Sequence, residues 1–151
     1  RSFGAHFVEV RWDPGISNLR VTRVVSAIDV GRAVNPMLIE GQLAGGLVQG
    51  IGGALFEEIH YDADGQLLNG SMADYLVPMA AEMPDMIIGH VETPTGESLL
   101  GAKGAGEAGT AGSPAAVMNA INDALRPMGA QVTEMPFTPE RILRALGALE
   151  D

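Results

Sequence analysis

NPMLIEGQLAGGLVQGIGGALFEEI occupies residues 35–59 and decides the fold, because it joins a helix start signal to a long glycine-rich run. Asn35 suits an N-cap and Pro36 suits the first position of a helix. We therefore predict a helix from Pro36 to about Ile59. At 100° per residue its apolar side chains gather on one side, which holds Leu43, Leu47, Val48, Ile51, Ala54 and Leu55.

Glycine and glutamine mark the other side of this predicted helix, which holds Gln42, Gly45, Gly46, Gln49, Gly50 and Gly53, joined by Ile39 and Phe56. Each glycine inside a helix costs roughly 1 kcal/mol relative to alanine. Several glycines on one face therefore need a physical reason. The usual reason is the close approach of something bulky or flat.

The segments that flank this helix predict strands. Residues 5–28 have the pattern of an antiparallel hairpin with a turn at DPGISN, and residues 86–93 have the pattern of a single strand. The segment MADYLVPMAAEMPD, residues 72–85, predicts a short strand followed by a loop, and AQVTEM, residues 130–135, predicts another short strand.

Two further helices are predicted near the C-terminal end by the same combination of a cap and a proline. Ser113-Pro114 starts a helix that runs to about Leu125, and Thr138-Pro139 starts the last one. The predicted fold class is α+β, with antiparallel strands and hairpins packed with the long glycine-rich helix and these two C-terminal helices.

Composition excludes several classes of function. The chain has 151 residues, enough for one compact core, and its 19 acidic and 9 basic residues give a net charge of −10. This balance argues against nucleic acid or an anionic membrane as partner, since phosphate binding needs clustered Lys and Arg. There is no cysteine, which removes thiolate zinc sites and iron–sulfur ligation. The longest apolar run, residues 43–56, is too short to span a bilayer.

A second glycine-rich stretch, GAKGAGEAGT at residues 101–110, contains the dinucleotide-binding pattern G-x-G-x-x-G from Gly104 to Gly109. That pattern requires a buried strand before it and a helix that it opens, whereas here the helix start signal comes only at Ser113. Glu107 would also face the pyrophosphate, and like charges at close range repel by roughly several kcal/mol. From the residues alone, an ordinary turn with a solvated glutamate and a loop that presents Glu107 both remain open, with nucleotide binding as a weaker third reading.

Three segments taken together resemble the molybdenum-hydroxylase large subunit of the xanthine dehydrogenase, aldehyde oxidase and carbon monoxide dehydrogenase family. They are DVGRAVNP, EGQLAGGLVQGIGGALFEE and GAKGAGEAGTAGSPAAV, at residues 29–36, 40–58 and 101–117. The resemblance runs from about Gly4 to Leu143. It implies that residues 1–151 are the C-terminal part of a molybdopterin-binding domain, either as a fragment or as a split subunit.

The resemblance also implies roles for individual residues. Glu107 takes the position of the active-site base beside molybdenum, and Gln42 takes the position of the glutamine that contacts the pterin. Gly106 lies at the cofactor in the family, and Gln49, two turns after Gln42, is a further candidate for cofactor binding. No protein side chain is expected to ligate the metal, because the pterin dithiolene holds it.

The implied cofactor is molybdopterin with Mo, in the cytosine dinucleotide form, while iron–sulfur clusters and FAD lie on other domains or subunits. The implied reaction oxidises an aldehyde, an N-heterocycle or a similar small substrate with water as the oxygen source. The expected partners are the remainder of the large subunit, the iron–sulfur and FAD subunits and the small-molecule substrate. This chain alone should be inactive, because other parts of the site lie upstream. The expected location is the cytoplasm, with the periplasm as the alternative. A non-catalytic binding or assembly module is the competing class of function.

Charged residues outside the glycine loop predict structural roles. We expect Asp29 and Arg32 to brace the entrance of the long helix as a pair. Glu57 and Glu58 end the predicted helix, where the helix dipole does not favour them. They are therefore expected to pair with basic groups outside this chain.

Overall fold

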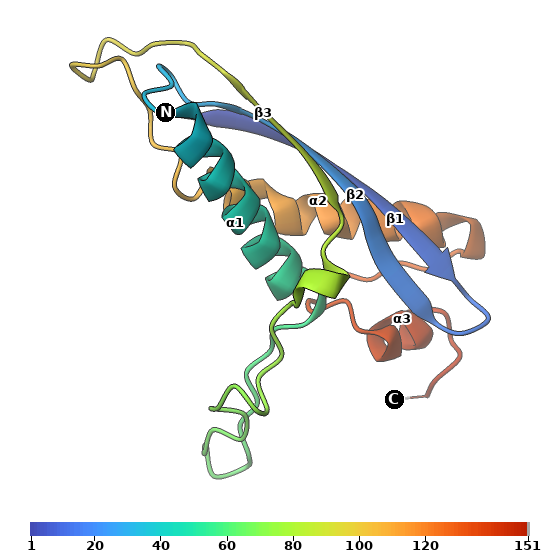
Figure 1. Ribbon diagram of the computed structural model, residues 1–151. Helices are drawn as coiled ribbons and strands as arrows, with labels where there is room; N and C mark the ends of the chain where they lie inside the picture. Colours follow the sequence, from blue (N-terminus) through green and yellow to red (C-terminus); the bar gives the residue numbers. More distant parts are fainter. Residues whose placement is uncertain (151) are drawn as a thin grey trace.

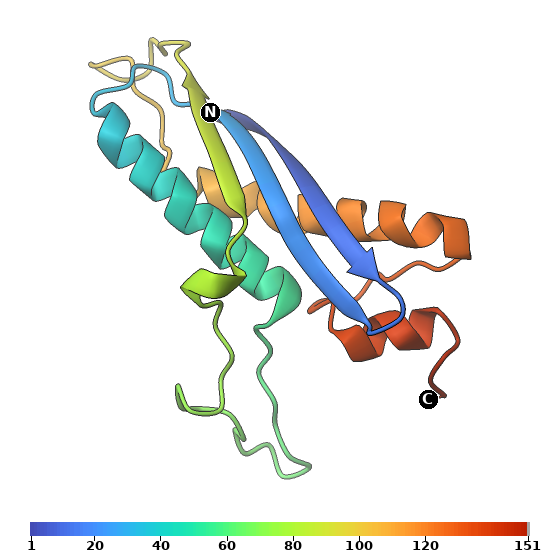
Figure 2. The same ribbon diagram turned by 45° about the vertical axis from the view of Figure 1, so that its right-hand side comes forward.

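The computed structural model describes residues 1–150 as two layers, a curved sheet and a layer of helices on one of its faces (Figures 1 and 2). The sheet contains β1 (Phe3–Asp13), β2 (Asn18–Asp29) and β3 (Asp85–Val91) in the order β1-β2-β3. Helices segregated to one face of a sheet are the mark of an α+β fold. The predicted fold class is therefore confirmed.

The sheet is mixed. β1 and β2 form the predicted antiparallel hairpin, with Phe3 opposite Asp29, but β3 pairs with β2 in parallel, with Arg23 opposite Asp85. The prediction of antiparallel strands is therefore wrong for this pair. The physical reason is the connection, because a long helix and an extended excursion separate β2 from β3 and bring the chain back to the starting end of β2.

The long helix α1 (Pro36–Leu55) begins as predicted. The Asn35 side chain accepts a hydrogen bond of 3.2 Å from the Leu38 N–H, and Pro36 occupies the first turn. The helix ends four residues before the expected Ile59. It lies against the face of the sheet beside α2 (Ala108–Leu125), which crosses behind β1 and β2 (Figure 2).

Helix α2 starts earlier than predicted. It begins at Ala108 inside the glycine loop, and the Glu107 carbonyl accepts the N–H groups of Thr110 and Ala111 at 3.1 Å. Ser113 and Pro114 are then interior residues of the helix and do not start it. The last helix, α3 (Pro139–Ala145), begins as predicted, with the Thr138 hydroxyl accepting the Arg141 N–H at 3.3 Å.

The two additional short strands are absent from the described residues. Residues 72–85, predicted as a short strand and a loop, begin with a turn and lead to the short 3-10 helix η1 (Ala80–Glu82). A second 3-10 helix, η2 (Arg126–Met128), follows α2. In residues 130–135, the backbone of Val132 pairs with a side chain and not with a strand. Asn122 donates to the Val132 carbonyl at 2.9 Å and accepts its N–H at 2.8 Å.

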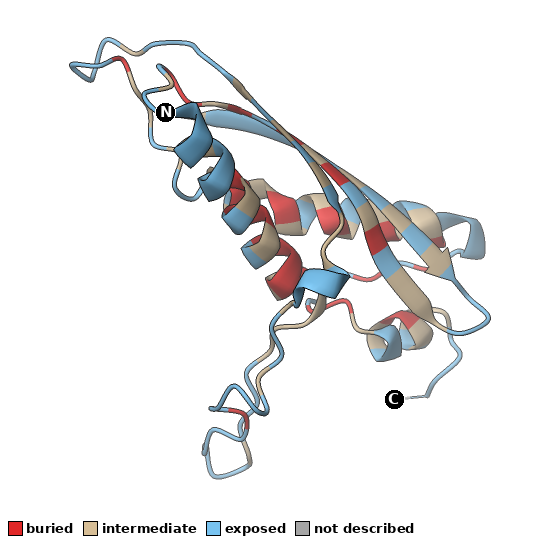
Figure 3. Cartoon of the chain, in the orientation of Figure 1, coloured by how far each residue is buried: buried red, intermediate tan, exposed pale blue. Residues whose placement is uncertain are grey.

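The core lies between the sheet and the helices (Figure 3). Its main cluster joins both long helices, β2 and the C-terminal segment, and its buried members are Val21, Val24, Leu47, Ile51, Ala54, Val117, Ile121, Leu125, Ala130, Val132, Phe137 and Ile142. A smaller cluster at the other end of α1 is formed by Ile28, Val30 and Leu43. The glycine loop packs on this smaller cluster through Ala105 and Ala108.

An extended arm, residues 56–79, leaves the end of α1 and projects away from the body (Figures 1 and 3). The segment YDADGQL, residues 61–67, contains a turn, with Gly65 at φ +80°. At the base of the arm, Asn69 accepts the His60 N–H at 2.9 Å and donates to the Glu58 carbonyl at 2.6 Å. No helix in residues 1–150 is long and apolar enough to cross a membrane.

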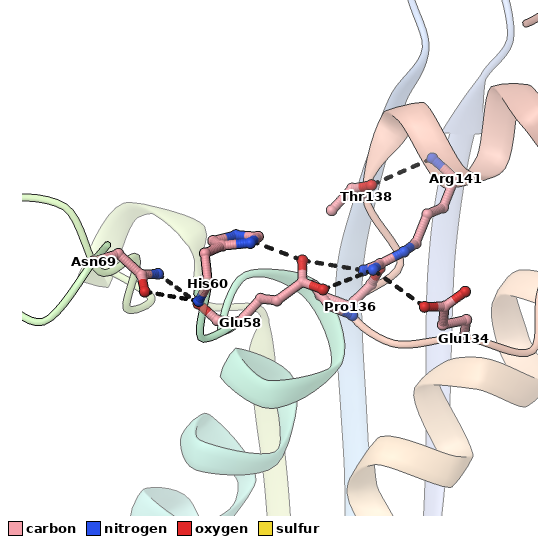
Figure 4. Close-up of polar contacts among 7 residues, drawn as sticks. All are labelled: Glu58, His60, Asn69, Glu134, Pro136, Thr138 and Arg141. Carbon is pink, nitrogen blue, oxygen red and sulfur yellow. Dashed lines mark hydrogen bonds and ion pairs between the residues drawn. The ribbon is translucent and has the colours of Figure 1, made fainter. Parts of the chain in front are cut away.

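The acidic residues after α1 have partners within the chain, contrary to the prediction. Glu58 accepts two hydrogen bonds from the Arg141 guanidinium, at 2.7 and 3.3 Å, and the Tyr75 hydroxyl donates to Glu57 at 2.8 Å. Figure 4 shows that Arg141 also reaches Glu134, at 3.4 Å. The bond from Arg141 is the main cause that lowers the pKa of the Glu58 carboxyl below its ordinary value. The sequence could not reveal this ion pair, because 83 residues separate its members.

Candidate functional site

The two long helices cross through small residues. A Cβ built on Gly109 of α2 would lie 2.6 Å from the Leu43 carbonyl oxygen, and one built on Gly46 of α1 would lie 3.0 Å from the Gly109 Cα. A Cβ on Gly50 would overlap the Ser113 hydroxyl. Only glycine permits this backbone approach. The crossing fixes the first turn of α2, and with it the glycine loop, against the middle of α1.

The crossing shows what lies against part of the predicted glycine face. Gly46 and Gly50 are buried against α2, so the bulky neighbour expected there is another helix. Gly45 and Gly53 behave differently, since a Cβ built on either would meet nothing within 4 Å, and the same holds for Gly41. Part of α1 therefore presents bare backbone to open space, with glutamine side chains along it.

Gln42 and the loop that carries Glu107 lie side by side. The Gln42 side-chain amide nitrogen is 3.7 Å from the position of a Cβ built on Gly106. Apart from the chain neighbours of Gly106, no other group of residues 1–150 lies within 4 Å of that position. Glu107 follows directly as the N-cap residue of α2 and is exposed, as is Gln42. Its side chain makes no capping hydrogen bond. Three of the four predicted site residues are thus brought together from segments more than sixty positions apart.

The fourth predicted residue, Gln49, lies two turns further along α1 and is tied to α2. The Thr110 hydroxyl is 3.3 Å from the Gln49 side-chain oxygen and 3.0 Å from the Gly46 carbonyl. Sequence reasoning missed Thr110. Its place three residues after Glu107, in a run of glycine and alanine, is the only signal that the sequence offers.

A charged pair that the sequence did not predict closes the other end of the loop. Asp29 pairs with Lys103 at 2.7 Å and not with Arg32, so the expected brace at the helix entrance is wrong. The bond from Lys103 is the main cause that holds the pKa of the Asp29 carboxyl well below its usual range, and the Gly31 N–H adds to the effect. The pairing follows from the path of the chain, because residues 101–103 return beside residues 30–32, directly after the end of β2.

The donor set around the bare part of α1 fits a pterin. Pterin rings are flat and carry hydrogen-bond donors and acceptors on their edges, which the exposed amides of Gln42 and Gln49 can match with either atom. The absence of side chains at Gly41 and Gly45 leaves room for a ring to approach the helix backbone. Within residues 1–150, no three His, Cys, Asp or Glu side chains are grouped so that they could hold a metal ion.

The nucleotide reading of the glycine loop finds partial geometric support. The loop does open a helix, contrary to the sequence-based objection, because α2 begins at Ala108. No buried strand precedes it, however: Leu99 and Leu100 are exposed, and only an isolated bridge joins Ala102 to Gly31. Glu107 also lies within the pattern, between Gly106 and Gly109.

Comparison with known proteins shows the family. Residues 1–84 match the molybdopterin cofactor-binding domain. Over 150 residues the chain is 44% identical to the nicotine 6-hydroxylase large subunit of Paenarthrobacter nicotinovorans, covering 99% of this chain and 18% of that protein. It is 35% identical over 144 residues to the carbon monoxide dehydrogenase large chain of Hydrogenophaga pseudoflava, covering 95% and 18% respectively.

The fold agrees with these matches. The crystal structure of quinoline 2-oxidoreductase from Pseudomonas putida 86 superposes with a TM-score of 0.93 at 41% identity, covering 97% of this chain and 19% of the other. The chain thus spans about a fifth of the length of the relatives that it matches. It belongs to the molybdopterin cofactor-binding family of molybdenum-hydroxylase large subunits, as the resemblance of its three segments predicts.

Proposed function

We propose that the intact protein is a molybdenum hydroxylase that oxidises an aldehyde, an N-heterocycle or a similar small substrate, with Glu107 as its base. The observation that carries this proposal is the juxtaposition of Gln42 and Gly106, with the exposed Glu107 as the next residue. Membership of the molybdopterin-binding family supports the reaction class. The relatives are named for nicotine and carbon monoxide, which also fits a small substrate.

In this proposal, three residues of the chain contribute to holding the cofactor in different ways. Gln42 offers its amide to the edge of the pterin, and Gly106 lets the cofactor pass close to the loop because it has no side chain. Gln49, oriented by Thr110, offers a second amide. The cofactor in this proposal is molybdopterin in the cytosine dinucleotide form with Mo. When bound, it supplies the oxidation of an electron-poor carbon with oxygen from water.

Glu107 is suited to accept a proton because its backbone is fixed while its carboxylate is free. Its carbonyl accepts two hydrogen bonds from the first turn of α2, and its side chain has no capping bond to break. A carboxylate held in this way can take a proton from the reacting group at hydrogen-bond distance. A general base of this kind contributes roughly 10²–10⁴-fold to the rate.

The remainder of the site lies in other parts of the protein. Because this chain spans about 18% of its relatives, the proposed partners are the rest of the large subunit and subunits that carry iron–sulfur clusters and FAD. The chain by itself is inactive under this proposal. The proposed location is the cytoplasm.

Changing Glu107→Gln in the intact enzyme tests the base. The isosteric amide keeps the size of the side chain and removes its ability to take a proton, so kcat should fall by roughly 10²–10⁴-fold. The molybdenum and pterin content, measured after purification, should stay at the wild-type level. Glu97→Gln, at an exposed position in the preceding loop, is the matched control and should keep full turnover. Wild-type turnover in Glu107→Gln would instead support a non-catalytic binding or assembly role for this chain.

A further inference from the structure

We infer that Asp29 and Lys103 form a positioning pair that sets the place of Glu107, so that their ion pair is needed for turnover beyond its contribution to folding. This inference rests on the proposed function, in which Glu107 is the base. Under this inference, both residues act on Glu107 through the segment between Lys103 and Glu107.

The pair is shielded from water and fully engaged. The Lys103 ammonium lies 2.7 Å from one Asp29 oxygen, and their side chains are 9% and 15% exposed. The other Asp29 oxygen accepts the N–H groups of Gly31 and Thr93 at 2.9 and 3.1 Å. The ammonium also lies 5.6 Å from the centre of the Phe3 ring, within the range of a cation–π contact. Lys103 is thus held by charge, hydrogen bonding and an aromatic face together.

The backbone around Lys103 is tied to the same place. Its N–H donates to the Val30 carbonyl at 2.9 Å, and the Arg32 N–H donates to the Gly101 carbonyl at 3.0 Å. Gly31 has φ +67°, and a Cβ at that position would collide with the Gly101 carbonyl oxygen. The close approach therefore requires glycine. The loop enters the site from a fixed point at the end of β2.

Glu107 lies between this fixed point and a second one. On its far side, Gly109 packs against the backbone of α1, and Ala108 packs on the small apolar cluster. On its near side, only three residues separate Glu107 from Lys103, and Gly104 and Gly106 are two of them. Glycine does not restrict the backbone by itself. Ala105 packs on the small apolar cluster, and the Gly104 carbonyl accepts the Ser2 hydroxyl at 2.7 Å. The Asp29–Lys103 pair adds a side-chain anchor where the segment begins.

Single and double variants of this pair should differ in stability. Removing one member of a shielded ion pair leaves an uncompensated charge, which destabilises the fold strongly, whereas replacing both by neutral residues of similar size is often neutral. Lys103→Met and Asp29→Asn alone should therefore lower the melting temperature. The double variant Asp29→Asn/Lys103→Met should recover it, because the amide oxygen of the new asparagine can still accept the N–H groups of Gly31 and Thr93.

The double variant separates positioning from folding. In the intact enzyme it should melt near the wild-type temperature and keep its molybdenum and pterin content, yet its kcat should fall by about 10–100-fold, since a displacement of about 1 Å can cost 10²-fold. KM should change little. Amide hydrogen exchange of residues 103–107 should become faster, which measures the loosening without reference to activity. Lys103→Arg, which keeps the charge, should have a higher kcat than Lys103→Met.

The control is the exposed pair of Asp123 and Arg126, whose side chains are 68% and 77% exposed. Asp123→Asn/Arg126→Met should leave kcat and exchange at wild-type values. Wild-type kcat and exchange in Asp29→Asn/Lys103→Met would overturn the positioning role while the proposed function stands. Wild-type turnover in Glu107→Gln would overturn the proposed function and this inference with it.

Discussion

Gly109 in the first turn of α2 lies directly against Leu43 in the middle of α1, so close that a Cβ at position 109 would come within 2.6 Å of the Leu43 carbonyl oxygen. Two helix backbones meet here with no side chain between them. The neighbour of the missing Cβ is main chain, which cannot rotate away as a side chain could. The position of the α2 start is therefore set by the backbone of α1.

Gly109→Ala should destabilise the protein, because the added methyl group must push the two helices apart. We expect a loss of about 1–3 kcal/mol in the free energy of unfolding, which is usual for overpacking a tight contact. Thermal or urea unfolding of the purified protein measures it.

The matched control for this change is Gly45→Ala, at an exposed position of α1, where a Cβ meets nothing within 4 Å. Because alanine is the better helix former, this variant should gain roughly 0.5–1 kcal/mol. Equal effects of the two substitutions would contradict the described crossing.

Gln42→Met should reduce cofactor retention with little effect on folding. Methionine matches the length of glutamine and removes both hydrogen-bonding groups of an exposed side chain. In the intact enzyme, the pterin and molybdenum content per protein should fall, and the melting temperature of the cofactor-free protein should stay constant. Gln66→Met, at an exposed position in the arm, serves as the control and should keep the full cofactor content.

Arg141→Met should loosen the junction between the end of α1 and α3. The guanidinium holds Glu58 at 2.7 Å and the Pro136 carbonyl at 2.9 Å, and both contacts are partly buried. We expect a loss of about 1–3 kcal/mol in unfolding free energy, since hydrogen bonds to charged groups are the stronger ones. Arg144→Met removes an arginine whose pair with Glu140 is exposed, and should cost less than about 1 kcal/mol.

The same ion pair predicts an acid limit to stability. The pKa of Glu58 is lower in the folded chain than its ordinary value of 4.5, because Arg141 binds the ionised carboxylate. The unfolded state therefore takes up the proton first as pH falls. The stabilisation is complete above about pH 4.5 and declines below it. Melting temperatures measured from pH 7 to pH 3 should show this decline. They should fall less steeply for Arg141→Met, and parallel curves for the two proteins would refute the assignment.

Local signals predicted much of the fold. Asn35-Pro36 and Thr138-Pro139 placed two helix starts correctly, since a cap and a proline act within one turn. The same logic failed at Ser113-Pro114. There, contacts of Gly109 with the distant α1 extend the helix back to Ala108, and no local pattern records such a contact. The parallel pairing of β3 depends on where a long connection returns, which the strand's own residues do not encode.

The candidate site likewise contains residues that the sequence predicted and pairs that it did not. The family resemblance singled out Gln42, Gly106, Glu107 and Gln49, and the fold brings the first three together. The Asp29–Lys103 pair and the Glu58–Arg141 pair join residues 74 and 83 positions apart, so only the folded chain reveals them. Charge and composition do not show which acidic residue pairs with which basic residue.

β1 is an outer strand of the sheet, and along one side its main-chain N–H and C=O groups pair with no other strand in residues 1–150. Such an edge is a template for a further strand from another molecule. When residues 1–151 are produced by themselves, concentration-dependent self-association through β1 is the expected behaviour. Phe7→Lys, at an exposed position on β1, would place a charge along that edge and keep this polypeptide monodisperse during purification.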